Sequence, residues 1–426
     1  MSGNFLDSAA VNRVVSYADA GRIVQEHAVS LADMRPSVQS TSLLDSLGLV
    51  LAEPVFADRD QPPFPRSTRD GFACRAADTG SGEPLTVLGL IRAGEAGLRA
   101  RESVALKAGE SVEIMTGAPV PAGADCVVMI EHVQRIDNTI RLNPGRSIHA
   151  GENIVPLGAE ARRGDVILPS GTRMAATQVG AAAACGAAEL RVFTRPRVAI
   201  VATGDELVEV NEPLRTHQIR NSNSYSLAAQ VLGAGAQPVR LPIARDEREP
   251  LEAAIRTGLE ADLLLLSGGV SMGKYDLVEE VLLSLGAEFF FTGALIQPGK
   301  PVVFGRIVVK ERPVYFFGLP GNPVSTIVTF SLFARPLLGA LCGEPYRGPR
   351  FAQGRLLSDV RVKTGLTRFL PAMLNSAGGE VTVEPVPWQG SGDLANTSRA
   401  NCFLVVPPDR PLLAAGETVT VLLQDW

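Results

Sequence analysis

The stretch Asp262-Leu-Leu-Leu-Leu-Ser-Gly-Gly-Val-Ser-Met-Gly-Lys-Tyr-Asp-Leu-Val278 decides the fold of this chain. Four consecutive leucines between an aspartate and a glycine turn predict a strand buried on both faces, as in parallel sheets that carry helices on each side. Backbone N–H groups and hydroxyls in a small-residue turn after such a strand suit an anion. The residues of this turn that we expect at a site are Ser267, Gly268, Gly269, Ser271, Lys274 and Asp276.

Two further apolar runs end in the same manner. Arg197–Leu207 closes with Thr-Gly-Asp-Glu-Leu, and Val314–Pro323 closes with Gly-Leu-Pro-Gly-Asn-Pro. Ligands of open α/β sheets bind outside the carboxyl ends of the strands, so three such ends predict one shared crevice. A single glycine turn is equally well explained by the need to reverse the chain. The prediction therefore depends on the three ends together.

Strand and helix patterns alternate between about Pro196 and Cys342, which predicts a parallel sheet built from right-handed crossovers. The polar run Asn221–Ser224 at the start of one helix either caps it or contacts a ligand. The expected strands are Val198–Ala202, Gln237–Pro242, Leu263–Leu266 and Val314–Phe317, and the expected helices are Ser222–Gly233, Pro250–Leu259 and a third after Tyr275.

The rest of the chain has a different pattern of apolar and turn residues. Short apolar runs between Pro and Gly turns predict a small inserted β domain at 61–151 and a β-barrel or sandwich at 344–426. Around the insert we expect an amphipathic helix at 17–31, a short helix through Leu43–Leu47, a strand at Val50–Val55 and an interior alanine-rich helix at Ala175–Ala188. The predicted domains are 12–60 together with 152–195, then 61–151, 196–343 and 344–426, which makes a multidomain α/β plus β protein with a helical/strand linker domain.

Composition restricts the function. A length of 426 residues suggests about three domains of ordinary size. A net charge of −5 gives no reason to expect nucleic acid or an anionic membrane as a partner. Five dispersed cysteines lack C-x-x-C or zinc spacing, the N-terminus lacks an apolar core, and we find no apolar run of about 18 residues. A cytoplasmic protein with reduced thiols is expected.

The titratable residues point to oxygen-ligand chemistry. No Ser-His-Asp order stands out, and His27 lies on the apolar stripe of its helix, where a structural role is expected. Asp70, Glu206, Asp246 and Asp276 fall in predicted loops, where carboxylates either hold Mg²⁺ beside a phosphate or act as caps and solvated turn residues.

Lys300 stands in Gln297-Pro-Gly-Lys-Pro301, where Pro298, Gly299 and Pro301 restrict the backbone. A fixed ammonium about 4 Å from an anion contributes on the order of 4 kcal/mol at an effective dielectric near 20. Lys300 is therefore expected to bind an oxyanion, and the alternative is a solvated loop charge.

Six motifs together resemble the MoeA family of molybdopterin molybdenumtransferases, which is also similar to the E domain of gephyrin. The resemblance runs in collinear order over nearly the whole chain. The motifs are Ser-x-x-Asp-Gly (67–71), Ile-Met-Thr-Gly-Ala-Pro-Val-Pro (114–121), Thr-Gly-Asp-Glu-Leu (203–207), Ser-Gly-Gly-Val-Ser-Met-Gly (267–273), Pro-Gly-Lys-Pro (298–301) and Gly-Leu-Pro-Gly-Asn-Pro (318–323).

The resemblance implies an enzyme of molybdenum cofactor biosynthesis. Such an enzyme cleaves the adenylate of adenylylated molybdopterin with Mg²⁺, releases AMP and inserts molybdate. The resemblance also implies an elongated homodimer, with each site formed between the α/β domain of one subunit and the inserted β domain of the other. A molybdopterin adenylyltransferase and recipient molybdoenzymes are the implied protein partners.

The resemblance further assigns roles to single residues. The implied catalytic residues are Asp70, Thr116, Glu206, Asp246, Asp276 and Lys300, of which Glu206, Asp246 and Asp276 would hold the metal ion. The implied substrate contacts are Ser267, Gly268, Gly269, Ser271, Lys274, Pro298, Gly299, Pro301, Gly321, Asn322, Arg368 and Ser391. Glu160 matches another acidic position of the family, and Lys274 stands where an acidic residue is common.

Three other functions compete with this one. A non-catalytic molybdopterin-binding or scaffold protein would not need four carboxylates near a phosphate. A molybdopterin adenylyltransferase would share the α/β domain but not the insert and the barrel. A nicotinamide-dependent dehydrogenase would need a G-x-G-x-x-G after its first strand, and none follows here.

Overall fold

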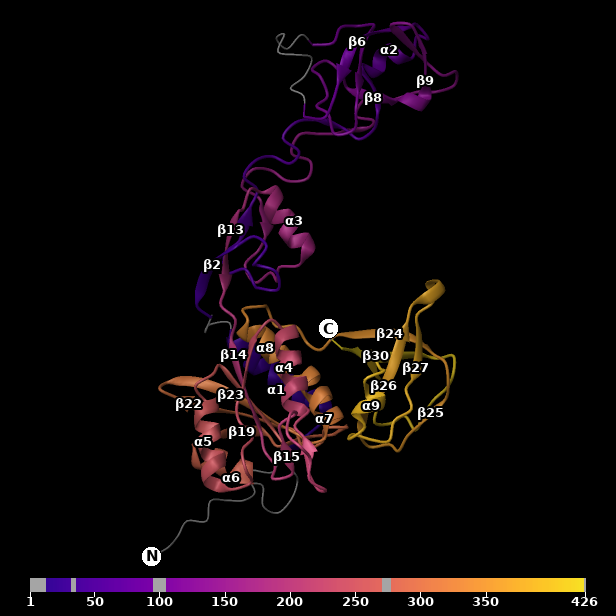
Figure 1. Cartoon of the computed structure of the whole chain (residues 1–426). Helices are drawn as coiled ribbons and strands as arrows, with labels where there is room; N and C mark the ends of the chain where they lie inside the picture. The colour runs from indigo at the N-terminus through magenta and orange to yellow at the C-terminus, as the bar shows by residue number, and fades with distance from the viewer. Residues whose placement is uncertain (1–12, 32–35, 95–104, 270–276, 425–426) are drawn as a thin grey trace, which may run out of the picture.

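The computed structural model describes residues 13–31, 36–94, 105–269 and 277–424, and it shows an elongated molecule (Figure 1). We call its parts the α/β unit (196–343), the insert (61–151), the connecting segment (36–60 and 152–195) and the barrel (344–424). The insert lies at one end of the molecule and the α/β unit at the other, with the connecting segment between them (Figure 1). The barrel lies beside the α/β unit.

The α/β unit contains a six-stranded sheet in the order β17-β14-β18-β23-β22-β19. The first four strands are parallel, as predicted, but β22 runs antiparallel to both of its neighbours, so the sheet is mixed. The strands are β14 (Arg197–Ala202), β17 (Gln237–Arg240), β18 (Leu263–Ser267), β19 (Glu288–Phe291), β22 (Val303–Val309) and β23 (Arg312–Leu319), and the helices between them are α4 (Asn223–Gly233), α5 (Arg248–Gly258) and α6 (Leu277–Ser284).

The strand β18 is buried on both faces, as its four leucines predict. Leu263 and Leu265 pack into one apolar cluster, and Leu264 and Leu266 pack into a second cluster on the opposite face. All four side chains are fully buried. Because side chains alternate along a strand, one run of leucines fills both cores.

The N-terminal helix of the chain and the last helix of the α/β unit complete the first cluster. The helix α1 (Tyr17–Ser30) begins at Ser16, whose hydroxyl accepts a hydrogen bond from Asp19 N at 3.0 Å, and it packs on α8 (Arg335–Leu341). His27 of α1 stacks on Phe290 with ring centroids 3.8 Å apart, and burial lowers the pKa of this imidazole. The predicted structural role of His27 is confirmed.

The helical run Pro323–Leu341 is the longest apolar helix in the described part of the chain, although serine, threonine and arginine side chains interrupt its apolar residues. It combines α7 (Pro323–Thr329), a π-helical turn (Phe330–Ala334) and α8, and its 19 residues have a mean hydropathy of 1.5 in the most apolar window. Length and composition would suffice to cross a membrane, but 78% of that window is buried inside the protein. Packing in the first cluster accounts for its apolar character.

The insert is a six-stranded sheet in the order β8-β5-β7-β6-β10-β9. Gly71 is required in β5, because a Cβ atom there would lie 1.9 Å from the carbonyl oxygen of Val128. The elements are β5 (Gly71–Cys74), α2 (Ala76–Thr79), β6 (Leu85–Ile91), β7 (Glu110–Ile114), β8 (Cys126–Met129), β9 (Val133–Ile136) and β10 (Thr139–Leu142).

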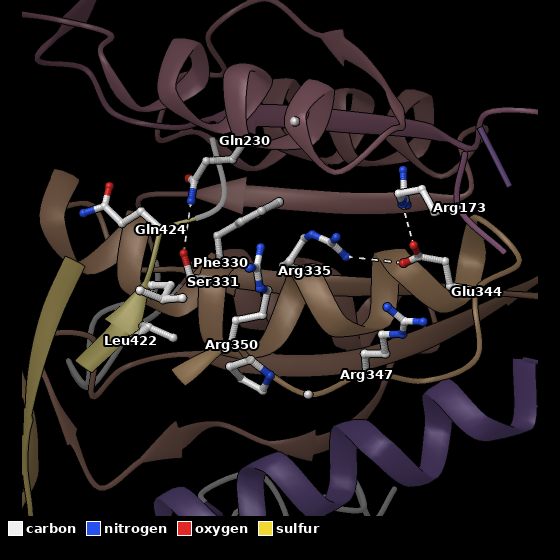
Figure 2. Close-up of a pocket in the computed structure, with 14 residues that line it drawn as sticks. Arg173, Gln230, Phe330, Ser331, Arg335, Glu344, Arg347, Arg350, Leu422 and Gln424 are labelled. Atoms are coloured by element: carbon white, nitrogen blue, oxygen red, sulfur yellow. Dashed lines mark hydrogen bonds and ion pairs between the residues drawn. The ribbon is translucent and has the colours of Figure 1, made fainter. Parts of the chain in front are cut away.

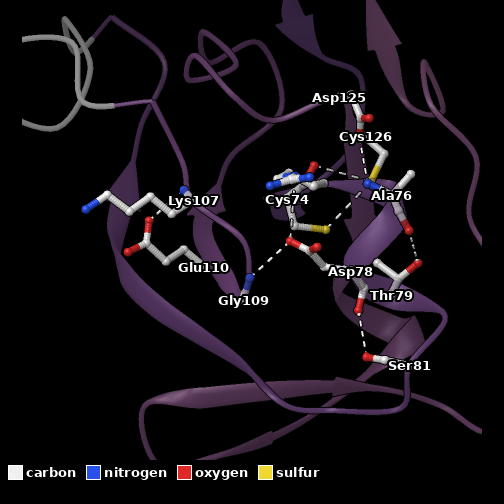
Figure 3. A network of polar contacts seen from close by, with 11 residues as sticks. Cys74, Ala76, Asp78, Thr79, Ser81, Lys107, Gly109, Glu110, Asp125 and Cys126 are labelled. Atoms are coloured by element: carbon white, nitrogen blue, oxygen red, sulfur yellow. Dashed lines mark hydrogen bonds and ion pairs between the residues drawn. The ribbon is translucent and has the colours of Figure 1, made fainter.

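Carboxylates hold the loops of the insert through backbone amides (Figure 3). Asp125 accepts a hydrogen bond from Ala76 N at 2.6 Å, and Asp78 accepts one from Gly109 N at 3.0 Å. The thiols of Cys74 and Cys126 lie 3.6 Å apart in the core beside this network. All five cysteines of the chain are buried and free, so these two aspartates and the thiols are structural features of the insert.

Three expectations for the connecting segment are wrong. Residues 43–48 form turns and not a helix, because Leu44 and Leu47 are exposed and the run has no buried stripe. Val50–Val55 is broken at Pro54 into isolated bridges and β3 (Val55–Phe56). The helix α3 (Ala176–Ala184) is mostly exposed, and only Ala182 is buried among its residues, because only one side of the helix packs on the rest of the segment. That side faces two small sheets, β2 (Val38–Ser42) with β13 (Glu189–Phe193) and β3 with β12 (Val166–Leu168).

The C-terminal strands form a closed five-stranded barrel, which decides between the predicted barrel and sandwich. The ring runs β26-β27-β24-β30-β28 and closes through the pairing of β28 with β26. Its strands are β24 (Phe351–Leu356), β26 (Thr367–Asn375), β27 (Thr382–Pro385), β28 (Cys402–Val406) and β30 (Thr418–Leu423). The short strand β21 (Ile296–Gln297) of the α/β unit pairs with β26, so the two units share a sheet edge.

The remaining elements are short strand pairs and one short helix. They are β1 (Val14–Val15) with β20 (Gly293–Ala294), β4 (Arg66–Ser67) with β11 (Ile154–Val155), β15 (Leu207–Val208) with β16 (Ile219–Arg220), β25 (Val360–Arg361) with β29 (Leu412–Leu413), and the helix α9 (Leu394–Thr397).

Candidate functional site

The carboxyl ends of the parallel strands are tied to one another by backbone hydrogen bonds. Thr203 N donates to Ser267 O at 3.0 Å, which joins the ends of β14 and β18. Gly268 N donates to Leu319 O at 3.2 Å, which joins β18 to β23. Thr203 also pairs with Ala244 beyond the end of β17. Four strand ends therefore meet at one edge of the sheet.

The glycines after β18 are needed for this close approach. Gly268 has φ +93°, and a Cβ atom there would lie 2.5 Å from Thr203 O. Gly269 has φ +65°, and its Cβ would lie 2.8 Å from the Thr203 hydroxyl. Because Gly268 N is already bonded to Leu319 O, it is not the free anion donor that the sequence suggested.

Asn223 links three of the loops at this edge with one amide group. Its Nδ2 donates to Ser267 Oγ at 2.9 Å and to Gly321 O at 2.7 Å. The helix start is instead capped by Asn221, whose Oδ1 accepts a hydrogen bond from Ser224 N at 3.2 Å. The run Asn221–Ser224 was expected either to cap the helix or to contact a ligand. In the structure Asn221 caps the helix, and Asn223 faces the strand ends.

Unpartnered polar atoms gather at the same edge. Within the described part of the chain, Thr203 Oγ1, Asn221 Nδ2 and Asn223 Oδ1 are buried and have no hydrogen-bond partner in the protein. A buried polar atom without a partner costs about 1–3 kcal/mol, so such atoms mark places where a water or a ligand binds. Sequence reasoning missed Thr203, although a polar residue directly after a buried strand was the available signal.

Two of the predicted metal ligands come from adjacent loops. Asp246 N donates to Asp205 Oδ1 at 3.4 Å, and Gly204 N donates to Ala244 O at 3.3 Å, so the loops after β14 and β17 are in contact. The Glu206 carboxylate lies over Gly204, where a Cβ atom would be 2.5 Å from Glu206 Oε2. Ser271, Lys274 and Asp276 lie outside the described residues.

The donor set at this edge fits Mg²⁺. Glu206 and Asp246 supply carboxylate oxygens, and the unpartnered Thr203 hydroxyl supplies a further oxygen, which are the ligand types that Mg²⁺ prefers. Among the described residues, no three His, Cys, Asp or Glu side chains are grouped closely enough to hold a metal ion. A complete set would therefore need a further ligand from a residue outside that part of the chain, such as Asp276, or from the substrate phosphate.

Three other predicted residues, Asn322, Ser391 and Arg368, lie where the barrel touches the α/β unit. Asn322 Nδ2 donates to Ser391 Oγ at 2.9 Å, and Val324 N donates to Ser391 O at 3.0 Å, so the Ser391 loop packs on the start of α7. The register of β21 with β26 places Gln297 opposite Arg368, whose Nε donates to Lys363 O at 3.0 Å.

The Lys300 loop packs on the same helix. A Cβ atom on Gly299, which has φ +106°, would lie 2.4 Å from Thr329 Cγ2 of α7. Pro298 and Gly299 are buried, whereas Lys300 and Pro301 are half-buried. Lys300 O accepts a hydrogen bond from Ala294 N at 3.0 Å, which holds the backbone of this loop. Gly321, which precedes Asn322, accepts a hydrogen bond from Asn223 and so connects the start of α7 to the strand ends.

Asp70 and Thr116 contact each other but lie far from the strand ends. Thr116 N and Thr116 Oγ1 donate to Asp70 Oδ1 at 2.7 and 2.8 Å, and these two hydrogen bonds lower the pKa of Asp70. Both residues belong to the insert, at the opposite end of the molecule from the α/β unit (Figure 1). Glu160 pairs with Arg66 Nη2 at 2.6 Å in an exposed ion pair near the insert.

Comparisons with known proteins agree with this architecture. Residues 15–186 match the family described as the MoeA N-terminal region (domain I and II), 199–340 match a probable molybdopterin binding domain, and 353–424 match the MoeA C-terminal region (domain IV). The molybdopterin molybdenumtransferase of Bacillus subtilis is 34% identical over 90% of this chain and 89% of its own length. That of Nostoc is 32% identical over 91% of this chain and 89% of its own length.

A solved structure extends the agreement to the fold. The crystal structure of the molybdopterin biosynthesis MoeA protein from Pyrococcus horikoshii OT3 superimposes with a TM-score of 0.75 at 27% identity, covering 97% of this chain and all of that one. The similarity covers nearly the full length of each relative. It therefore includes the motifs, the strand ends and the barrel described above. The chain therefore belongs to the MoeA family, whose relatives carry the name molybdopterin molybdenumtransferase.

Proposed function

We propose that this protein is a molybdopterin molybdenumtransferase that acts in molybdenum cofactor biosynthesis. Its substrates are adenylylated molybdopterin and molybdate, and hydrolysis of the adenylate consumes water and releases AMP. The observation that carries the proposal is the junction of four strand ends with three unpartnered buried polar atoms, in a chain that belongs to the MoeA family.

The residues at the strand ends have separate tasks. Asn223 and Thr203 offer hydrogen-bonding atoms to the substrate, and Gly268 and Gly269 allow the turn after β18 to approach Thr203 closely. Glu206, Asp246 and Asp276 would hold Mg²⁺, which supplies positive charge at phosphate oxygens when bound. Lys300, Arg368 and Ser391, gathered around α7 and β26, supply cationic and hydroxyl groups for an oxyanion.

The position of Asp70 and Thr116 leads to the proposed assembly. Both residues are far from the strand ends of their own chain (Figure 1). A homodimer in which the insert of one subunit covers the strand ends of the other would complete the site. We place this homodimer in the cytoplasm, with a molybdopterin adenylyltransferase upstream and molybdoenzymes as recipients of the product.

The test is AMP release from adenylylated molybdopterin by the purified protein. We expect release that requires both Mg²⁺ and molybdate and that falls at least about 100-fold in Asp70→Ala and in Asp276→Ala, as for loss of an essential catalytic group. Asp409→Ala, which removes an exposed carboxylate of the barrel, is the control and should keep full activity.

Two outcomes would contradict the proposal. Binding of molybdopterin without any AMP release would indicate a scaffold protein. AMP release that ignores molybdate, or that survives both substitutions, would indicate a different reaction.

A further inference from the structure

Residues 203–221, which we call the Glu206 loop, lead from the end of β14 to the start of α4. Two backbone hydrogen bonds hold the base of this loop: Ile219 N donates to Glu206 O at 2.9 Å, and Asn221 N donates to Val208 O at 2.9 Å. The strand β15 that directly follows Glu206 has only 2 residues. The path of the chain at Glu206 therefore depends on what holds the far end of β15.

Arg240 holds that far end. Arg240 is the last residue of β17, and Glu209 directly follows β15. Arg240 Nη2 donates to Glu209 Oε2 at 2.9 Å and to Glu209 Oε1 at 3.2 Å. The side chains of Arg240 and Glu209 are 29% and 32% exposed, so water screens this ion pair only in part.

The same guanidinium group contacts the start of α4. Arg240 Nε donates to Ser224 Oγ at 3.2 Å, and its Cζ atom lies 3.6 Å from the centroid of the Tyr225 ring. The Tyr225 hydroxyl in turn donates to Glu209 Oε2 at 3.3 Å. An ion pair near the surface contributes little to stability by itself, but a planar guanidinium that binds several partners fixes their relative positions. Arg240 thus joins β17, the Glu206 loop and α4.

The helix α4 is a fixed support for this contact. Its Leu227 and Val231 side chains are fully buried in the first apolar cluster. Gln230 Nε2 donates to Ile327 O of α7 at 3.3 Å and to Ser331 Oγ of the π turn at 3.4 Å (Figure 2). Contact with α4 therefore fixes the Glu206 loop relative to the core of the α/β unit.

We propose that Arg240 is a positioning residue for the candidate site. Through Glu209 it holds the Glu206 loop, and with it the Glu206 carboxylate, in place at the strand ends. This inference rests on the proposed function, in which Glu206 would hold Mg²⁺. A misplacement of about 1 Å, even one caused by a change far from the reacting atoms, can lower a rate about 100-fold, so a loosened loop should have a measurable effect.

Hydrogen–deuterium exchange of the full chain without substrate measures whether the loop is held. Arg240→Ala should raise the exchange rate of the segment 207–221 at least about 10-fold, because the short β15–β16 pairing then opens more often. Glu209→Ala tests the same link without a change in β17 and should have a similar effect.

The matched control is Arg306→Ala. Arg306 also combines an ion pair with an aromatic ring, since its Nε lies 2.7 Å from Glu288 Oε2 and its Cζ lies 5.7 Å from the centroid of the Phe290 ring. It pairs with Tyr315, which pairs with the first residue of β18, so it lies toward the opposite end of the parallel strands from the candidate site. This variant should leave the exchange of 207–221 unchanged.

AMP release measures whether the position of the loop matters for the reaction. In Arg240→Ala and in Glu209→Ala, the Mg²⁺ concentration for half-maximal release should rise at least about 10-fold, whereas Arg306→Ala should keep the wild-type value. A loss of folded protein lowers the rate but does not shift this concentration. The double variant Arg240→Ala/Glu209→Ala should need no more Mg²⁺ than Arg240→Ala, because both changes break the same link.

Failure of this proposal can be told apart from failure of the proposed function. If the wild type releases no AMP, the proposed function is wrong, and the exchange measurement alone decides whether Arg240 holds the loop. With an active wild type, three results would each overturn the role of Arg240: an unchanged Mg²⁺ requirement in Arg240→Ala, unchanged exchange of 207–221, or full additivity of the two single effects in the double variant.

Discussion

At the residue scale, Asn223 has the most specific geometry in the candidate site. Its amide nitrogen holds Ser267 and Gly321 in place while its oxygen stays unpartnered. Asn223→Asp keeps the shape but replaces the hydrogen bond to Gly321 O by repulsion between two oxygens, and the Ser267 hydroxyl must become the donor. We expect AMP release to fall at least about 10-fold in kcat/KM, which corresponds to about 1.4 kcal/mol.

The control for this prediction is Asn401→Asp in the barrel. Asn401 has the same bonding chemistry, since it accepts from Leu374 N at 2.7 Å and donates to Leu374 O at 2.9 Å. This variant should lose stability without a change in KM. Equal losses of stability and activity in both variants would show that Asn223 only holds the loops together.

Asp70 provides a prediction about pH. Two hydrogen bonds from Thr116 lower its pKa below the usual 3.8. A lowered carboxyl pKa means that the contact stabilises the folded state above the usual pKa and is lost as the pH falls through the lowered value. Thr116→Val removes the hydroxyl donor, so the pKa of Asp70 should rise part of the way to its usual value.

An NMR titration of labelled aspartate side chains measures this change. Thr139→Val, whose hydroxyl donates to Ile136 O and does not contact Asp70, should leave the titration of Asp70 as it is. An unchanged pKa of Asp70 in Thr116→Val would assign the whole effect to the backbone N–H of Thr116.

Sequence reasoning reached some of these residues and not others. Glu206 and Asp246 follow strands, so the topology alone predicted that their loops would be neighbours, as the contact of Asp205 with Asp246 N shows. The role of Asn223 was left open, because its partners lie 44 and 98 positions away in the chain. A side-chain amide that bridges such distances leaves no local pattern.

At the element scale, β18 is the support of the candidate site. Its leucines fill two cores on opposite faces of the sheet, with Leu264 and Leu265 fully buried. Leu264→Ala and Leu265→Ala should each lower the free energy of unfolding by about 2–5 kcal/mol, since each leaves a cavity in a different core.

Urea unfolding measures both effects, and Leu214→Ala is the control. Leu214 is 45% exposed, so its truncation should change the stability of the protein by less than about 0.5 kcal/mol. If one of the two buried variants were as stable as the wild type, the strand would not be packed on both faces.

Helices and strands with a regular pattern of apolar residues were predicted well. Elements whose position depends on the geometry of a turn were not. The parallel strands and α1 follow from apolar runs and a 3.6-residue stripe. The hairpin of β22 with β23 was missed because its turn residues, Lys310 and Glu311, have positive φ angles without the usual Asn or Gly. The alanines of α3 suggested burial, yet small side chains are tolerated on an exposed helix face.

At the scale of the whole molecule, the separation of Asp70 from Glu206 has a measurable consequence (Figure 1). If one subunit supplies Asp70 and the other supplies Glu206, then Asp70→Ala and Glu206→Ala each inactivate both sites of their own homodimer. A mixed dimer of the two variants contains one site with both residues intact and one site that lacks both.

Random pairing of equal amounts of the two variants makes half of the dimers mixed, and each mixed dimer has one working site of two. The mixture should therefore recover about a quarter of the wild-type rate of AMP release when the twofold assembly is correct. The control is a mixture of Asp70→Ala with Thr116→Ala, which damage the same half-site, so every mixed dimer lacks a complete site. Recovery in the first mixture and not in the second requires that the insert of one subunit act at the strand ends of its partner. No recovery in either mixture would show that Asp70 does not contribute to the site of the other subunit.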